Sequence, residues 1–301
     1  MELLVRAVRR YELPTWGVLF AVYTGFGLLT WSYQLLPWWL LLPLGGWLVC
    51  WHSQLQHEFL HGHPTRSALL NGLLAAPSLG LWLPYLRYRD AHLEHHRSEN
   101  LTDPLADNES MYVTASRWAR LPAPARWLLW INQTLAGRML VGPPLVVAAT
   151  LWGEIRLLLA GDGRAWLGWL LHVPVLAALL FWLLAICQIP LWAYVLLFVW
   201  PGLSLTLLRS YYEHRPAPSR EARSVLIERG GLLGLLFLNN NLHALHHAEP
   251  GLAWFELPRV FAARRAELRA TGVGYWYRGY GDWFRRYLFC PKDSPVHPGT
   301  A

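Results

Sequence analysis

Three short windows of the sequence concentrate histidine at spacings that suit metal binding. They contain eight of the thirteen histidines: His57 and His61; His92, His95 and His96; and His243, His246 and His247. Positions i, i+3 and i+4 share one face of an α-helix, so each window can direct its imidazoles at one point. The neutral imidazole is the commonest metal ligand and suits iron, zinc, copper and nickel. Eight imidazoles are too many for one ion, and we therefore expect a pair of metal ions.

Two long uncharged stretches indicate how these windows are held. No Asp, Glu, Lys or Arg occurs between Glu12 and Glu58, or between Arg164 and Arg209. Each stretch is about twice the roughly 20 residues that cross a bilayer, and a polar, proline-containing break interrupts its middle. We predict an all-α integral membrane protein with four transmembrane helices in two hairpins, at residues 15–33, 37–56, 165–187 and 191–208.

The composition agrees with a lipid-facing protein. Hydrophobic residues make up 54% of the chain and charged residues 15%, below the quarter or so that is typical of soluble domains. The net charge of +7 comes almost wholly from arginine, since Lys292 is the only lysine. These arginines flank apolar spans, which indicates contact with lipid head groups and not with nucleic acid. The three isolated cysteines indicate neither a disulfide framework nor a zinc ribbon.

The distribution of arginine predicts the orientation. The hairpin tips carry no Arg or Lys, whereas the N-terminus (with Arg6), residues 66–164 and the chain from Arg209 onward carry them all. By the positive-inside rule both termini and all large loops are cytoplasmic, and the compact chain suggests a bacterial inner membrane. The apolar segments 69–86 and 140–160 contain prolines and are expected to be interfacial, or re-entrant for 69–86. We expect one domain over residues 1–290 and a disordered tail at 291–301.

Helix length places the histidines at one level. At about 1.5 Å per residue, helices that start at Pro37 and Leu191 emerge from the bilayer near His57 and His214 on the same side. The other two windows lie in cytoplasmic segments that can fold back under the membrane. We therefore predict a cytoplasmic helical cap that holds a histidine-rich di-metal site at the mouth of the bundle.

The order of the windows resembles a known family. They read HxxxH, HxxHH and HxxHH, the first two about 30 residues apart and the third after the second hairpin. This pattern resembles the histidine boxes of the membrane fatty acid desaturase and hydroxylase superfamily over about residues 15–261. Thr102, Asp103, Pro104 and Asp107, after the second box, are similar to the beta-carotene hydroxylase branch. Tyr212, Glu213 and His214 are similar to the extra box of membrane alkane hydroxylases, which supplies a ninth histidine ligand.

The resemblance implies a non-haem di-iron centre that uses O2 and two electrons to attack an unactivated C–H bond. The ligands that it implies are His57, His61, His92, His95, His96, His214, His243, His246 and His247, with no catalytic residue beyond them. No cytochrome b5 domain is present in the sequence, so the electrons are expected from a separate protein such as a ferredoxin. The expected substrate is lipid-like and the expected reaction is fatty acyl desaturation. Hydroxylation of a carotenoid, an alkane or another apolar substrate stays open.

Other polar residues near the boxes are candidate partners of the ligands. A metal-bound imidazole normally donates its second N–H to an oxygen, which fixes the tautomer. The candidates are Asn240, Glu94, Asp103 and Glu213, followed by Glu58, Asp107 and Asn241; each could equally be a solvated side chain. Whether His63 or His52 joins the site stays open, and His172 is expected to be a hydrogen-bonded packing residue within the membrane.

Two other classes of protein remain as alternatives. His57, Glu58 and His61 form an HExxH sequence, which is the signature of zinc metallopeptidases. That chemistry needs one zinc and one further ligand, and it leaves six clustered histidines unexplained. A metal transporter should carry its ligands within the spans, where only His52 and His172 lie.

Overall fold

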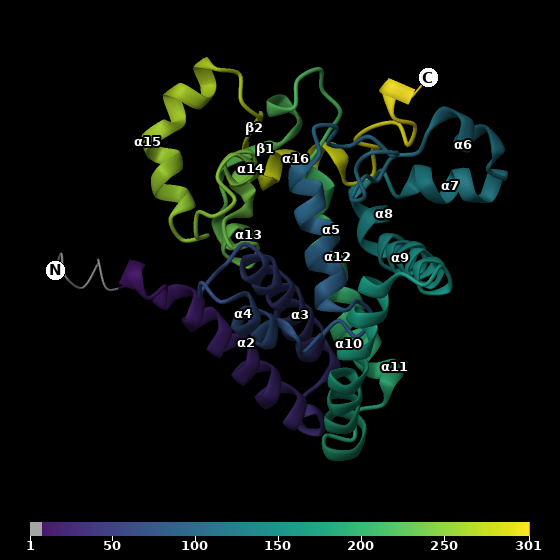
Figure 1. The fold of residues 1–301 in the computed structure, drawn as a ribbon, viewed down its shortest axis with the longest axis vertical. Coiled ribbons are helices and arrows are strands. Elements are labelled where there is room, and N and C mark those ends of the chain that lie inside the picture. Colours follow the sequence, from purple (N-terminus) through teal and green to yellow (C-terminus); the bar gives the residue numbers. More distant parts are fainter. Residues whose placement is uncertain (1–7, 301) are drawn as a thin grey trace. The chain divides into compact units, whose positions relative to one another are not determined.

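Figure 1 shows the computed structural model of the protein, in which residues 8–300 are described. Arg6, which contributes to the predicted orientation, and Ala301 of the predicted tail lie outside these residues. The chain divides into two compact units. Unit 1 contains the chain up to Arg89 together with Val146–Thr206, and unit 2 contains Asp90–Leu145 together with the chain from Leu207 onward.

Unit 1 is built from helices. They are α2 (Leu13–Trp31), α3 (Trp38–Leu60), α4 (Ala68–Ala75), α10 (Gly163–Phe181) and α11 (Leu191–Tyr194). A π-helical turn, Trp182–Ile186, extends α10, and a second one, Val195–Val199, leads from α11 into α12 (Trp200–Glu213). The boundaries between the units fall within α5 (Tyr85–Arg97), α9 (Gly142–Leu159) and α12.

Prolines and a capping aspartate set the starts of these helices. Pro14 lies in the first turn of α2, where a missing N–H breaks no helical hydrogen bond. Helix α3 begins directly after Pro37, and α11 begins directly after Pro190. Asp162 caps α10 by accepting a hydrogen bond of 2.7 Å from the Ala165 N–H. The breaks between paired helices therefore occur where the sequence places proline.

Glycines allow close packing inside unit 1. A Cβ atom added to Gly202 of α12 would lie 2.6 Å from the Val49 Cβ on α3, and one added to Gly45 would lie 2.7 Å from the Leu197 carbonyl oxygen. Small residues at such crossings let helix backbones approach within a membrane, where van der Waals packing replaces the hydrophobic effect. The middle of α3 therefore packs directly against the end of the second hairpin.

Four helices among the described residues are long and apolar enough to cross a membrane: Leu13–Trp31, Gly142–Leu159, Gly163–Ile186 and Leu191–Glu213. Three of them overlap predicted spans. The remaining one is α9, where we expected an interfacial helix, whereas α3 covers the predicted span 37–56 and is not among the four. Gln54, Gln56 and His57 near the end of α3 lower its mean hydropathy. The protein is thus a mostly helical membrane protein with four candidate spans.

An irregular segment, residues 76–84, follows α4 in unit 1. Four carbonyls in or just before it accept hydrogen bonds from side chains of other helices. The pairs are Tyr23 with Leu74 (2.6 Å), Gln56 with Ala75 (2.8 Å), Tyr194 with Leu79 (2.7 Å) and His172 with Leu81 (2.9 Å). Because water is scarce among apolar helices, irregular backbone there must find its partners within the protein. The side chains of α2, α3, α10 and α11 meet this requirement.

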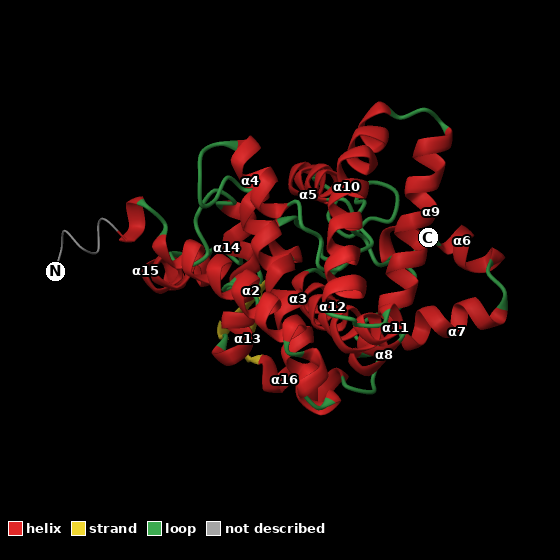
Figure 2. Ribbon diagram, turned by 90° about the horizontal axis from the view of Figure 1, so that it is seen from below, coloured by secondary structure: helices red, strands yellow, loops and turns green. Residues whose placement is uncertain are grey.

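Unit 2 consists of short helices and one small sheet (Figure 2). Its helices are α6 (Ala115–Arg120), α7 (Ala123–Ile131), α8 (Leu135–Leu140), α13 (Gly231–Leu236), α14 (His243–Ala248), α15 (Leu257–Ala270) and α16 (Tyr280–Tyr287). Strands β1 (Val225–Arg229) and β2 (Tyr275–Gly279) pair in parallel, with Val225 opposite Tyr275. The all-α prediction is confirmed for the bulk of the chain, and this pair is the exception, where β-branched and aromatic residues favour strands.

A hydrophobic core fixes the position of α14, which carries the third histidine box. The core contains Leu226 of β1, residues of α14 and its approach, and residues of α15: Leu242, Ala244, Leu245, Leu257, Phe261 and Leu268. Helix α14 has only six residues, too few to be stable alone. Its apolar positions pack into this core, so its histidines project from a fixed support.

The end of the chain is bound to unit 2. Lys292 N–H donates to the Gln133 carbonyl at 2.8 Å, Val113 N–H donates to the Pro295 carbonyl at 2.9 Å, and His297 N–H donates to the Val113 carbonyl at 3.0 Å. This differs from the disordered tail expected at residues 291–301. The composition of the tail is polar and rich in proline, but its backbone finds specific partners that are distant in the sequence.

Candidate metal centre

Four histidines of unit 2 turn one nitrogen each toward a common point. The ligand atoms of His95, His214, His243 and His247 all lie within 4.8 Å of one another. Nε2 of His214 lies 3.1 Å from Nε2 of His95 and 2.9 Å from that of His243, which lies 3.1 Å from Nε2 of His247. A metal–nitrogen bond of about 2.0–2.1 Å places neighbouring ligand nitrogens about 2.9–3.4 Å apart. The observed spacing of this first set matches a coordination shell.

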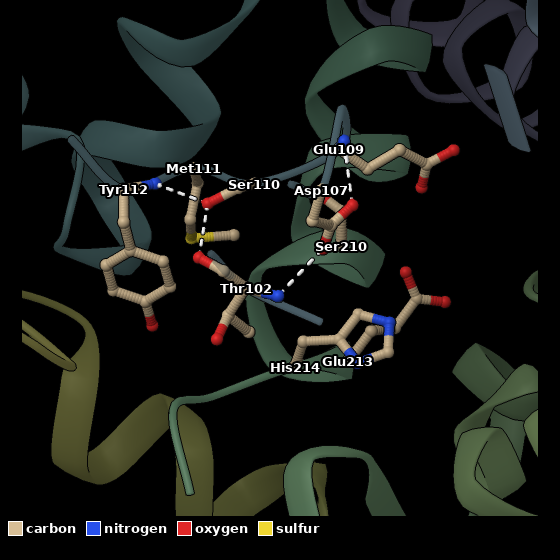
Figure 3. A pocket seen from close by; sticks show the side chains of 9 residues that line it. All are labelled: Thr102, Asp107, Glu109, Ser110, Met111, Tyr112, Ser210, Glu213 and His214. Atoms are coloured by element: carbon tan, nitrogen blue, oxygen red, sulfur yellow. Dashed lines mark hydrogen bonds between the residues drawn. The ribbon is translucent and has the colours of Figure 1, made fainter. Parts of the chain in front are cut away.

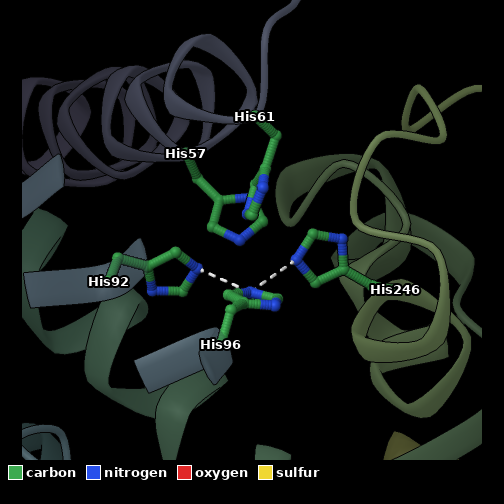
Figure 4. A group of neighbouring side chains, drawn as sticks. All are labelled: His57, His61, His92, His96 and His246. Carbon is green, nitrogen blue, oxygen red and sulfur yellow. Dashed lines mark hydrogen bonds between the residues drawn. The ribbon is translucent and has the colours of Figure 1, made fainter. Parts of the chain in front are cut away.

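A second set of histidines in unit 2 has the same arrangement. Nε2 of His96 lies 3.0 Å from Nε2 of His92 and 3.2 Å from Nε2 of His246 (Figure 4). His92, on α5, and His246, on α14, are 1% and 2% exposed. The two sets alternate along the boxes, since α5 contributes His92 and His96 to one and His95 to the other. Adjacent ions could therefore share the same two helices.

Oxygen partners determine which nitrogen of each ring faces inward. His95 Nδ1 lies 2.7 Å from an Asp107 carboxylate oxygen, and His92 Nδ1 lies 2.8 Å from one of Glu109. A carboxylate only accepts, so both rings donate from Nδ1, which leaves a lone pair on Nε2 when the ring is neutral. Fixing the tautomer through the outer nitrogen is what a metal-binding imidazole requires.

The third box has a similar support. His243 Nδ1 lies 3.0 Å from the Asn240 side-chain oxygen, while the Asn240 amide donates to Glu213 at 2.6 Å. Arg209 forms an ion pair of 2.7 Å with the same Glu213 carboxylate. The Asn240 oxygen therefore faces His243 and accepts its proton. His214 Nδ1 lies 3.2 Å from the Ser224 hydroxyl.

Lone pairs that converge in this way repel one another unless a cation lies between them. At about 3 Å the Nε2 atoms cannot all be paired by protons, because rings that donate from Nδ1 have no second proton when neutral. A metal ion at the centre of each set would satisfy every Nε2 atom at once. The donor set consists of neutral nitrogens, which suits iron, zinc, copper or nickel in preference to magnesium or calcium. The residues therefore fit a transition-metal site.

The surroundings favour the neutral ring in three of the four histidines of the first set. Burial lowers the pKa of His214 and His243 well below the usual value for histidine, and the neighbouring imidazoles lower it further. Burial and the His214 ring do the same to the pKa of His247. His95 differs: burial lowers its pKa, but the Glu109 and Asp107 carboxylates outweigh burial and raise the pKa to about 9. Three rings are thus held neutral, the form that binds metal.

The sequence matches the model of the fatty acid desaturase family over residues 33–279. The chain belongs to the fatty acid desaturase family. Its histidine groups fit the metal site of this family, and membership makes the protein an oxidoreductase of the desaturase or hydroxylase type. No curated protein matches the chain.

The first histidine box lies in unit 1. His57 and His61, at the end of α3, have ring centroids 4.9 Å apart and ligand atoms within 4.8 Å of each other. His57 is buried, with an exposed fraction of 3%. Helix α3 ends at Leu60, and Gly62 adopts a left-handed backbone with φ of 92°. The helical spacing predicted from HxxxH is therefore present, with both rings on one face.

Only some of the partners predicted from the sequence lie beside a histidine. Of the carboxylates and amides proposed from the sequence, Asn240 and Glu213 lie beside His243, and Asp107 lies beside His95. Glu94 accepts a hydrogen bond from the Asn108 amide, and Asp103 accepts one from the Leu105 N–H. Glu109 and Ser224 were missed, because neither stands at a spacing that links it to a box.

Histidines outside the boxes have other partners. His63 Nδ1 lies 2.7 Å from a Glu12 carboxylate oxygen. His52 Nε2 lies 3.2 Å from the Tyr23 hydroxyl, which also donates to the Leu74 carbonyl. With His172 bound to the Leu81 carbonyl, both membrane histidines belong to the network around residues 76–84. None of the three is in a group with metal-ligand spacing among the described residues.

A small cavity lies beside His214 (Figure 3). Its volume is about 30 Å³, room for about two water molecules. The lining residues include Thr102, Asp107, Glu109 and Glu213. The loop that forms one wall is held internally: the Thr102 N–H donates to Asp107 at 2.8 Å, and the Ser110 hydroxyl donates to the Thr102 carbonyl at 2.6 Å. The carboxylates that orient His92 and His95 thus stand on a fixed loop.

Proposed function

We propose that this family member is a di-iron oxidase that uses O2 to attack an unactivated C–H bond of a lipid-like substrate, most simply by fatty acyl desaturation. The observation that carries the proposal is the pair of histidine sets in unit 2, whose Nε2 atoms converge while oxygens bind Nδ1 of His92, His95 and His243. Family membership gives the class of reaction, and this geometry supports two metal ions.

The proposed ligands divide between the two ions. His95, His214, His243 and His247 would hold one ion. His92, His96 and His246 would hold the other, and the box of His57 and His61 would supply the last two of the nine predicted ligands. Bound iron would supply the redox chemistry for oxidation of a C–H bond by O2. All nine proposed ligands are imidazoles, so the protein would place no carboxylate directly on either ion.

The chain's own residues would then have three tasks. Asp107, Glu109 and Asn240 hold the rings in the tautomer that directs Nε2 inward. The near-complete burial of His92, His95 and His243 limits the access of water to a reactive centre. The apolar helices of unit 1 supply surroundings in which an alkyl chain is soluble. Each task follows from contacts or burial and does not depend on the identity of the substrate.

The partners and the orientation complete the proposal. Two electrons for each turnover would come from a separate protein, such as a ferredoxin. We place both termini and the metal site in the cytoplasm on the basis of the arginine distribution, in a membrane that we take to be a bacterial inner membrane.

The reaction can be tested by lipid profiling under labelled oxygen. A host that expresses the protein is compared with one that expresses the His95→Ala variant, with both grown under ¹⁸O2. Desaturation predicts products that have lost two hydrogens and carry no label. Products that carry one ¹⁸O atom would replace desaturation with hydroxylation as the reaction, and identical lipids in the two hosts would contradict both.

A further inference from the structure

The only lysine of the chain is buried against the histidine site. Lys292 lies in the C-terminal segment, and its side chain is 3% exposed. Its ammonium donates to the Tyr211 carbonyl at 2.6 Å and to the His214 carbonyl at 2.8 Å, and it lies 3.6 Å from the Asp293 carboxylate. Removing an ammonium group from water is costly unless its hydrogen bonds are replaced. Here two carbonyls replace them, and the Asp293 carboxylate supplies a nearby opposite charge.

These carbonyls belong to the end of α12, where partners are scarce. The last carbonyls of a helix have no intrahelical N–H and carry partial negative charge. Helix α12 ends at Glu213, so His214 lies just beyond it. A cation at this position both satisfies the carbonyls and complements the helix dipole. Lys292 therefore fixes the backbone at the point where the chain leaves α12.

His214 depends on that backbone for its place in the first histidine set. Its Nε2 lies within 3.1 Å of those of His95 and His243, yet it comes from neither box helix. The Ser224 hydroxyl lies beside Nδ1 of the His214 ring. The His214 backbone is held by an isolated β-bridge to Ser224 and by the Lys292 ammonium. A shift of the His214 carbonyl would therefore move the ring relative to its two neighbours.

The C-terminal segment also contacts the residues that orient His95. His297 Nε2 lies 3.1 Å from the Thr102 hydroxyl, and the Thr102 N–H donates to the Asp107 carboxylate that orients His95. The Tyr112 hydroxyl donates to Asp293 at 2.7 Å. The C-terminal segment thus contacts the supports of two histidines that belong to the same set.

We propose that the C-terminal segment is a positioning element of the metal centre, in which Lys292 holds the His214 carbonyl and so keeps the His214 ring in the set of His95, His243 and His247. The proposal rests on the proposed function, since it concerns the ion that these four histidines would hold. Lys292 acts through His214 and does not itself touch the metal or the substrate. The segment should therefore affect one ion more than the other.

The test compares Lys292→Met and Lys292→Arg with Cys290→Ser, a nearby control at an exposed cysteine. Full-length proteins are purified in detergent, stripped of metal and reloaded with Co²⁺, and both the ions bound per chain and the visible absorption spectrum are measured. Lys292→Met should weaken binding of one ion about ten- to a hundredfold, the usual effect of losing a group that supports a ligand, and change the spectrum. Lys292→Arg, which keeps the charge, should restore part of both, and Cys290→Ser should match the wild type.

Two outcomes separate this inference from the function on which it rests. If the wild type binds two ions and Lys292→Met binds both with unchanged affinity and spectrum, the positioning role is wrong and the di-metal site stands. If the wild type binds no second ion, the proposed function itself fails.

A chemical measurement does not depend on the variants folding. Acetylation of amines in the native protein should spare Lys292 and modify it only after denaturation. Rapid acetylation of Lys292 in the folded protein would overturn the proposal.

Discussion

His95 Nδ1 and an Asp107 carboxylate oxygen lie 2.7 Å apart, with the two side chains 1% and 2% exposed. This contact directs His95 Nε2 at His214 Nε2, 3.1 Å away. The same carboxylate accepts the Thr102 N–H, so its own position is fixed. Asp107 is therefore the link between a loop of unit 2 and the orientation of one candidate ligand.

Replacing Asp107 should weaken metal binding without unfolding the protein. Asp107→Ala removes the acceptor for His95 Nδ1, so the ring can rotate or change its tautomer, and affinity for one ion should fall about ten- to a hundredfold. Competition with a chromogenic chelator measures this change. Asp103→Asn is the matched control, because that carboxylate caps the Leu105 N–H. Equal affinities in Asp107→Ala and the wild type would refute the role of Asp107.

The two histidine sets should lose their ions separately. His95→Ala removes a ligand from one set and His246→Ala removes a ligand from the other, so each variant should retain about one ion per chain and lose turnover. His63→Gln is the control, since His63 pairs with Glu12. Elemental analysis of purified protein gives the count. Retention of two ions and full turnover in either alanine variant would show that the altered residue is not a ligand.

The hydrogen bonds to residues 76–84 should contribute to stability and not to metal binding. Tyr194→Phe leaves the Leu79 carbonyl without its 2.7 Å donor in a buried position, which should cost about 1–3 kcal/mol. Thermal unfolding in detergent should show a lower midpoint, while the metal content stays at the wild-type level. Tyr33→Phe, in the turn between α2 and α3, should leave the midpoint unchanged. A metal loss in Tyr194→Phe at full stability would indicate a different role for this segment.

Close packing at Gly202 should be sensitive to a single methyl group. The Cβ of Gly202→Ala would lie 2.6 Å from the Val49 Cβ, so α3 and α12 must separate, at a cost of about 1–3 kcal/mol. Gly17→Ala on α2 is the control, because no heavy atom lies within 4 Å of that added Cβ, and alanine favours the helix. Thermal unfolding of the two variants should therefore shift in opposite directions. A stable Gly202→Ala variant would mean that these helices do not pack as described.

The histidine groups are predictable from sequence because their geometry is local. Helical spacing brings His92 and His96 together, because positions i and i+4 share one face of a helix. The spacing does not show that His95 belongs to the other set, which the structure reveals. Asn240 is also local, because it lies three residues before His243. Glu109 and Ser224 could not be found in this way. They reach their histidines through a loop and through a bridge between distant segments, and no periodic pattern records such contacts.

The membrane helices show the same limit. Proline and the absence of charge locate the breaks at Pro37 and Pro190, and three candidate spans overlap the predicted ones. Whether α3 and α9 cross the membrane is harder to predict from hydropathy. Gln56 of α3 donates a hydrogen bond to the Ala75 carbonyl, yet such a polar residue lowers the mean hydropathy of its helix. The C-terminal segment has the composition of a disordered tail. In the structure its backbone and Lys292 bind partners that are distant in the sequence, which composition does not reveal.

The converging imidazoles are proposed to hold two iron ions. The direct measurement is metal content combined with Mössbauer spectroscopy of protein produced with ⁵⁷Fe and purified without oxygen. We expect about two iron ions per chain, with both lost in a variant that lacks His95 and His246. One zinc ion per chain, together with peptidase activity, would contradict it.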